Sequence, residues 1–90
     1  MITPGDPNPS LPAPGTQVCI PFTTAGGGTP TGTVTHANGT TLSPNVTLAP
    51  HPANTYVICF TWPPGNTTSD VTIVAGGESI TFSVAGTGGP

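Results

Sequence analysis

Proline and glycine recur along the whole chain, with thirteen of each in 90 residues, and no stretch between them has helical periodicity. A proline inside a helix removes a hydrogen bond and clashes with the preceding turn. Between these breaks the apolar residues alternate with threonines in short runs, which is the pattern of half-buried β-strands. The 18 threonines strengthen this indication, because β-branched side chains suit a pleated sheet. The chain is therefore predicted to be all-β.

Six or seven short strands separated by turn signals favour a small antiparallel β-sandwich or a small barrel. Asn38-Gly39 is the signal of a two-residue hairpin turn, and Pro44 is expected to split the segment that follows it. Pro21 favours an edge position or a bulge for the first long strand. The segments expected to form strands are residues 16–23, 31–36, 40–49, 55–62 and 71–84.

The last of these segments predicts its own register if Gly76-Gly77 forms a two-residue turn, which places Ala75 opposite Glu78. Apolar partners then meet on one face of the hairpin and threonines meet on the other. A slip of one residue would destroy this agreement, so the register is well specified. The predicted pairs are Val71 with Phe82, Ile73 with Ile80, and Thr72 with Thr81.

Residues 1–15 contain five prolines, which favour an extended, polyproline-like arm. At about 3.1 Å per residue such an arm reaches roughly 45 Å. Two interpretations remain open, a loose tail or an arm that lies on a neighbouring subunit. The segment has neither the basic start nor the apolar run of a secretory signal. Residues 16–86 are expected to form the sandwich and residues 87–90 a flexible C-terminal tail.

Two of the predicted strands, residues 16–23 and 55–62, are apolar on both faces. One face of an antiparallel sheet normally meets water, and a domain of this length has little interior to spare. Either the domain covers both faces itself or a partner covers one of them, and we expect a partner. The candidate partner-binding residues are Ile2, Pro4, Pro7, Pro9, Leu11, Pro12, Tyr56 and Trp62.

Cys19 and Cys59 lie in these two apolar strands. They form either a disulfide that closes a loop of about 40 residues or two buried thiols that act as small apolar side chains. Because no secretory signal is found, the sequence favours reduced thiols. The cysteine and histidine spacings do not match a zinc site. His36 and His51 are expected to be exposed loop residues.

The charge pattern excludes several classes of function. The chain has no lysine or arginine and a net charge of −3, so neither nucleic-acid binding nor a polybasic membrane anchor is expected. No apolar run approaches the ~20 residues of a membrane-spanning helix. Asp70 and Glu78 lie roughly 17 Å apart on opposite faces in the inferred hairpin, too far for a glycosidase pair. With no nucleophile elbow either, we expect no enzyme activity and no cofactor.

Three stretches together resemble small immunoglobulin-like β domains on the virions of tailed bacteriophages, in particular capsid decoration (minor capsid) proteins. They are the proline-rich start MITPGDPNPSLPAPG, the threonine-rich TGTVTHANGTTL and the final hairpin DVTIVAGGESITFSV. Antibody-type domains place a tryptophan between their paired cysteines, whereas Trp62 follows Cys59. The resemblance therefore implies a looser sandwich than the antibody type.

The resemblance implies a non-enzymatic structural protein of the virion, assembled in the bacterial cytoplasm. Its partners would be the major capsid protein or another virion protein and further copies of itself. The proline-rich arm would then run along the shell or a neighbouring copy. The alternative is a glycan-binding or adhesin-type sandwich module of a surface, secreted or phage tail protein, which would work outside the cell. A disulfide favours the alternative, and free thiols favour the virion protein.

Overall fold

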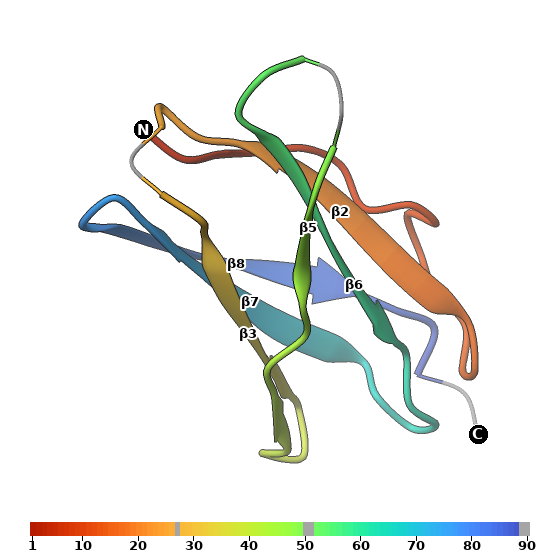
Figure 1. Cartoon of the computed structure of the whole chain (residues 1–90). Helices are drawn as coiled ribbons and strands as arrows, with labels where there is room; N and C mark the ends of the chain where they lie inside the picture. Colours follow the sequence, from red (N-terminus) through yellow and green to blue (C-terminus); the bar gives the residue numbers. More distant parts are fainter. Residues whose placement is uncertain (27, 50–51, 89–90) are drawn as a thin grey trace.

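Two antiparallel sheets of four strands each form the computed structural model, which describes residues 1–26, 28–49 and 52–88 (Figure 1). The described part of the chain contains no helix, so the predicted all-β class is confirmed. The first sheet has the order β1-β2-β6-β5 and the second the order β4-β3-β7-β8. The strands are β1 (Thr3–Pro4), β2 (Gln17–Thr23), β3 (Thr31–His36), β4 (Thr41–Leu42), β5 (Val46–Leu48), β6 (Thr55–Thr61), β7 (Thr68–Ala75) and β8 (Glu78–Ala85).

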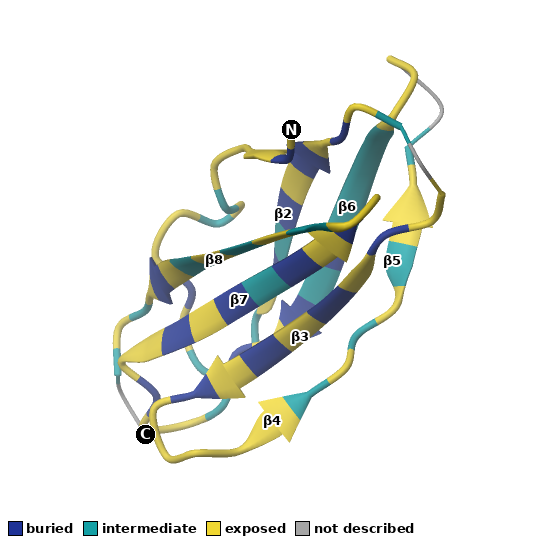
Figure 2. Ribbon diagram, turned by 90° about the vertical axis from the view of Figure 1, so that its left-hand side faces the viewer, coloured by how far each residue is buried: buried dark blue, intermediate teal, exposed yellow. Residues whose placement is uncertain are grey.

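The core lies between the two sheets and is filled by every second residue of the longer strands (Figure 2). The inward residues include Val18 in β2, Ile58 in β6 and Trp62, which directly follows β6, each with an exposed fraction of 0%. The single chain therefore buries the inner faces of its two most apolar strands. The second sheet covers these inner faces, so no partner is needed to complete the interior, and a partner on the outer face stays a prediction. The facing residues of that sheet are Val34, Val71, Ile73, Ala75 and Val84.

The predicted C-terminal hairpin is confirmed in position and register. β7 and β8 pair around Gly76-Gly77, with Ala75 opposite Glu78. The Thr72 and Thr81 hydroxyls lie 2.9 Å apart on the outer face of the hairpin. The other predicted pairs, Val71 with Phe82 and Ile73 with Ile80, are also formed.

The turn at Asn38-Gly39 differs from the prediction by one residue. Thr35 pairs with Thr41, and the His36 N–H donates to the Thr40 carbonyl, so three residues form the turn instead of two. Gly39 has a φ of 91°, the left-handed conformation that closes three-residue hairpin turns. The predicted split at Pro44 is confirmed, because β4 ends before it and β5 begins after it.

Pro21 lies in an interior strand, contrary to the expected edge position or bulge. β2 pairs with β1 on one side and β6 on the other. Pro21 faces Val57 at a position where the two strands exchange no hydrogen bond, so the missing N–H removes nothing from the ladder. Its carbonyl points the other way and accepts from the Gly5 N–H at 2.7 Å.

The proline-rich segment lies along β2 of its own chain. Thr3 and Pro4 pair with the end of β2, and Asn8 exchanges two backbone hydrogen bonds of 2.9 Å with Cys19. Ile2 has an exposed fraction of 5% and belongs to the core. The interpretation as a loose tail is therefore wrong in this structure, because β2 has an edge that the segment fills. Contact of the segment with a neighbouring subunit stays a prediction.

The two ends of the described chain contact the sandwich. The Glu78 carboxylate accepts from the Ile2 N–H at 3.2 Å and lies 3.2 Å from the Met1 ammonium group. The backbone hydrogen bond, followed by the ammonium group, lowers the pKa of Glu78. At the other end, the Thr87 N–H donates to the Pro12 carbonyl at 3.1 Å. Residues 89–90 of the expected C-terminal tail lie outside the described residues.

Candidate functional site

The eight residues proposed to bind a partner fall into three groups by exposure. Ile2, Pro12 and Trp62 are buried within the chain and have no surface to offer a partner. Pro7, Pro9 and Tyr56 are half-buried, and the Tyr56 ring stacks on Phe22 with centroids 5.8 Å apart. Only Pro4 and Leu11 are exposed. Trp62 was proposed because alternation reveals a strand face but not whether another sheet covers it, and Pro12 was proposed as part of the extended proline-rich arm.

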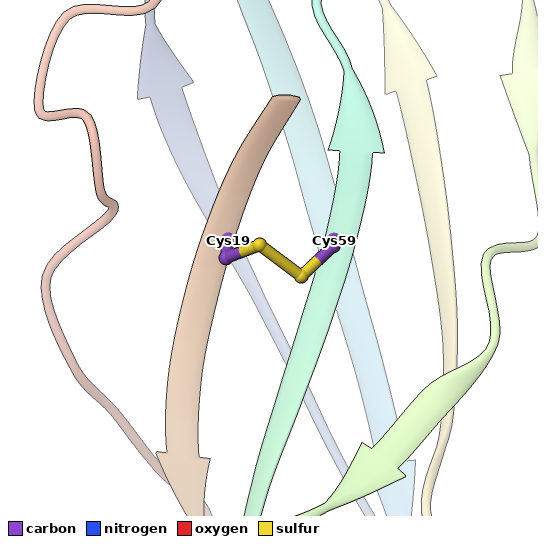
Figure 3. Close-up of a disulfide and its surroundings, with 2 residues drawn as sticks. All are labelled: Cys19 and Cys59. Atoms are coloured by element: carbon purple, nitrogen blue, oxygen red, sulfur yellow. A yellow bond between two sulfur atoms is a disulfide. The ribbon is translucent and has the colours of Figure 1, made fainter. Parts of the chain in front are cut away.

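Cys19 and Cys59 form a disulfide between the neighbouring strands β2 and β6, 40 residues apart in the sequence (Figure 3). Of the two alternatives, the structure therefore has the disulfide, and the preference for reduced thiols is wrong. The two residues are directly opposite in the ladder, and both are half-buried on the outer face of the first sheet. The disulfide accounts for Cys19 and Cys59 among the apolar residues on the outer faces of β2 and β6, and a partner on this face stays a prediction.

A cleft of about 630 Å³ lies at the end of the sandwich where β6 ends and the chain turns from β3 to β4. Ligand sites commonly have volumes of about 300–1,000 Å³. None of the described residues that line the cleft is an acid, a lysine or an arginine. Trp62 is fully shielded and forms the floor of the cleft without exposing its ring. The lining residues are Pro14, Gly15, His36, Asn38, Thr40, Leu42, Thr61, Trp62, Pro63 and Pro64.

A buried polar network lies behind the cleft wall. The Asn66 Oδ1 accepts from the Ala37 N–H at 3.0 Å, which fixes the orientation of the Asn66 amide. The Asn66 Nδ2 therefore donates to the Ser69 Oγ at 2.7 Å. The Trp62 Nε1 donates to the Asn66 carbonyl at 2.8 Å, so Asn66 links the floor of the cleft to the network.

This network assigns the tautomer of His36. The Ser69 Oγ accepts from Asn66, and the His36 Nδ1, 2.7 Å away, is the acceptor that the described residues offer to the Ser69 hydroxyl proton. The hydroxyl is therefore assigned as the donor to that nitrogen. The Asn66 Nδ2 also lies 3.5 Å from the same nitrogen, a contact that favours an unprotonated Nδ1. The proton of the neutral imidazole is consequently on Nε2, and this N–H is a donor.

His36 is buried, with an exposed fraction of 6%, and the expectation of an exposed loop residue is wrong. Its ring lies between the network and two aromatic rings, with centroids 6.0 Å from Phe60 and 6.5 Å from Trp62. Burial lowers the pKa of His36 and favours the neutral imidazole. The signal was present in the sequence, because Gly32 and Val34 share the inward face of β3 with His36. His51, the other histidine expected in a loop, lies outside the described residues.

The Ser69–His36 contact has the distance of a nucleophile and its base, but its burial prevents that chemistry. Ser69 has an exposed fraction of 1%, so a substrate carbonyl has no access to the hydroxyl. The contact instead holds the imidazole in one orientation. Within residues 1–26, 28–49 and 52–88, no three histidine, cysteine or acidic side chains gather in a way that could hold a metal ion.

The comparisons with known proteins add no relative. No family model matches the chain, and no curated protein or solved structure is similar to it. The described residues also contain no helix long and apolar enough to cross a membrane.

Proposed function

We propose that this protein is a non-enzymatic, adhesin-type module with an immunoglobulin-like sandwich, which works outside the cytoplasm and binds a protein partner in the cleft. The Cys19–Cys59 disulfide is the observation that carries the proposal. Disulfides persist in oxidising environments and are rare in the cytosol. A small domain with few charges gains from such a cross-link the rigidity that a binding cleft needs.

The lining of the cleft favours a protein partner over a glycan. Glycan binding by stacking needs exposed aromatic rings, but Trp62, Phe60 and Phe22 are buried in the core. Tyr56 stacks on Phe22 and is not among the residues of the cleft. Prolines, Leu42 and small polar groups remain to contact a ligand, which suits an uncharged protein segment.

Arrays of uncharged peptides and of neutral glycans, probed with the oxidised protein, test this function. We expect saturable binding to a subset of the peptides and no binding to the glycans. Thr40→Trp, which fills the exposed rim of the cleft, should abolish binding. Thr33→Trp adds the same bulk on the exposed outer face of β3 and should leave binding unchanged. Equal binding by both variants, or binding to glycans alone, would contradict the proposal.

A capsid decoration protein is the second candidate, and the exposure of Pro4 and Leu11 favours it. Both residues belong to the segment that the resemblance assigns to shell binding, and Leu11 has an exposed fraction of 57%. Such a protein should co-sediment with undecorated shells of a tailed phage, and Leu11→Glu should prevent this. A monomeric protein that does not bind such shells would exclude this candidate function.

A further inference from the structure

Strand pairing along the outer edge of β6 stops halfway. β2 pairs with all of β6, from Thr55 to Thr61, on the inner side. On the outer side, β5 pairs only with Tyr56, Val57 and Ile58, and its register ends at Val46 opposite Ile58. The chain reaches β5 from β4, and beyond Ile58 the strand β6 pairs only with β2 among the described residues. Residues 59–61 therefore have no described strand on the side away from β2.

The backbone groups of Thr61 point toward this open edge. The Cys19 N–H donates to the Asn8 carbonyl, and the Cys19 carbonyl accepts from the Asn8 N–H. Both backbone groups of Cys19 therefore face away from β6, so Cys19 and Cys59 are a pair that exchanges no hydrogen bond. Opposite pairs alternate along an antiparallel ladder, so Thr61, two residues further and opposite Gln17, is of the same type. Its N–H and C=O face away from β2 and are available to a further strand.

The open edge is continuous with the cleft, because Thr61 and Trp62 both line it. The cleft is also lined by a polar side chain, that of His36. His36 is more than nine-tenths buried, its Nδ1 is bonded to Ser69, and among the described residues its Nε2–H has no partner. A strand edge and a fixed N–H donor thus meet in one open, uncharged groove.

We propose that the cleft binds an extended, uncharged peptide segment of a partner protein by adding a strand to β6 beside Thr61. The peptide exchanges backbone hydrogen bonds with Thr61, one of its carbonyls accepts from the His36 Nε2–H, and an apolar side chain packs against Leu42 and Pro63. This inference rests on the proposed function, because it names the kind of partner that the cleft takes.

An extended peptide fits these observations better than other occupants. β5 already pairs with this edge of β6 at residues 56–58, just before the open part of the edge. An unpaired strand edge is satisfied by another backbone, which a small apolar molecule does not supply. The absence of acids, lysines and arginines from the described lining disfavours a charged ligand, because a buried charge would find no counter-charge.

The test uses the oxidised full chain and blocked six-residue peptides in which threonine alternates with valine, leucine or phenylalanine. Binding is followed by the amide NMR signals, with hydrogen exchange at Thr61. We expect saturable binding and slowed exchange of the Thr61 amide. The same peptides methylated at alternate backbone nitrogens, which cannot pair with an edge, should bind about tenfold more weakly.

A variant of Thr61 separates edge pairing from simple burial. Thr61→Pro removes the N–H that faces the open edge and costs no hydrogen bond to β2, so the fold should survive while peptide binding falls about tenfold. Thr33→Val changes only an exposed side chain on β3, outside the cleft, and should bind normally. His36→Phe keeps a ring but removes the donor, and we expect a similar loss. Because His36 is buried, Thr61→Pro and the methylated peptides remain decisive if that variant is unstable.

Each outcome decides the inference. Binding that is indifferent to methylation and to Thr61→Pro would overturn strand addition, yet the proposed function would survive if Thr40→Trp still blocked it. No peptide binding together with concentration-dependent self-association, protecting the same Thr61 amide, would replace the peptide with a second copy. No binding on the peptide array and no effect on Thr61 would end both proposals.

Discussion

Cys19 and Cys59 are joined at a position where β2 and β6 exchange no backbone hydrogen bond, with Cα atoms 4.1 Å apart. Side chains approach most closely at such pairs in an antiparallel sheet. The backbone of Cys19 forms two hydrogen bonds with Asn8 on the opposite side of β2. Cys19 therefore links β2 to the N-terminal segment on one side and to β6 on the other. The disulfide also encloses β3, β4 and β5, which lie between the two cysteines in the sequence.

Replacing both cysteines with alanine should lower the free energy of unfolding by about 3–4 kcal/mol, the entropy of closing a loop of this length in the unfolded chain. Urea denaturation with and without a thiol reductant measures the change. The reductant should destabilise the natural chain by a similar amount and leave the double variant unaffected, which serves as the control. If the reductant shifts both proteins equally, or neither, the disulfide does not stabilise the fold.

A second prediction concerns Gly86, which lies against the indole ring of Trp62. A β-carbon at Gly86 would overlap the indole, and the ring has no room to move because its Nε1 donates to Asn66. Gly86→Ala should therefore cost about 3 kcal/mol, the upper range for overpacking a core. Gly32→Ala is the matched control, because there the added carbon overlaps the end of the Ile58 side chain and otherwise lies at ordinary contact distance, 3.6 Å from the Val46 Cγ2. That end can rotate, so a cost of about 1 kcal/mol is expected by urea denaturation. Equal costs would show that the indole moves freely.

The hairpin of β7 and β8 could be predicted because all its information is local. Two glycines fix the turn, and the side chains on either side agree with only one register. The split at Pro44 is local in the same way, since proline cannot continue a ladder. The turn after His36 was one residue off because both turn types use glycine with a positive φ.

The site could not be predicted because it depends on contacts between distant segments. His36 is buried by Ser69 and Asn66, 33 and 30 residues away. The path of residues 1–15 depends on the free edge of β2, which the sequence does not identify. Composition correctly disfavoured a helix there, but proline spacing says nothing about which surface an extended segment covers.

The N-terminal segment should behave as part of the fold when its buried residue is changed. Ile2→Ala should destabilise the protein by about 2–4 kcal/mol, because Ile2 belongs to the core. Leu11→Ala, in the same segment but 57% exposed, should change stability by less than about 0.5 kcal/mol. Thermal and urea denaturation of the two variants provide the comparison. A loose arm would predict no effect from either.

Stability should decrease as the pH falls through the range in which His36 is protonated in the unfolded chain. Burial places the pKa of His36 below its ordinary 6.5, so the unfolded state binds the proton first. The free energy of unfolding should be level above about pH 7 and fall from about pH 6.5 toward the folded pKa. Measurements stop at about pH 5, above the ordinary pKa of Glu78, which is 4.5. Because the pKa of Glu78 is lowered in the folded chain, protonation of this carboxylate destabilises the fold only in more acidic solution. His36→Gln should remove the slope, whereas His51→Gln, which removes the other imidazole of the chain, should retain it. A slope that follows His51 would show that His36 is not the group that titrates.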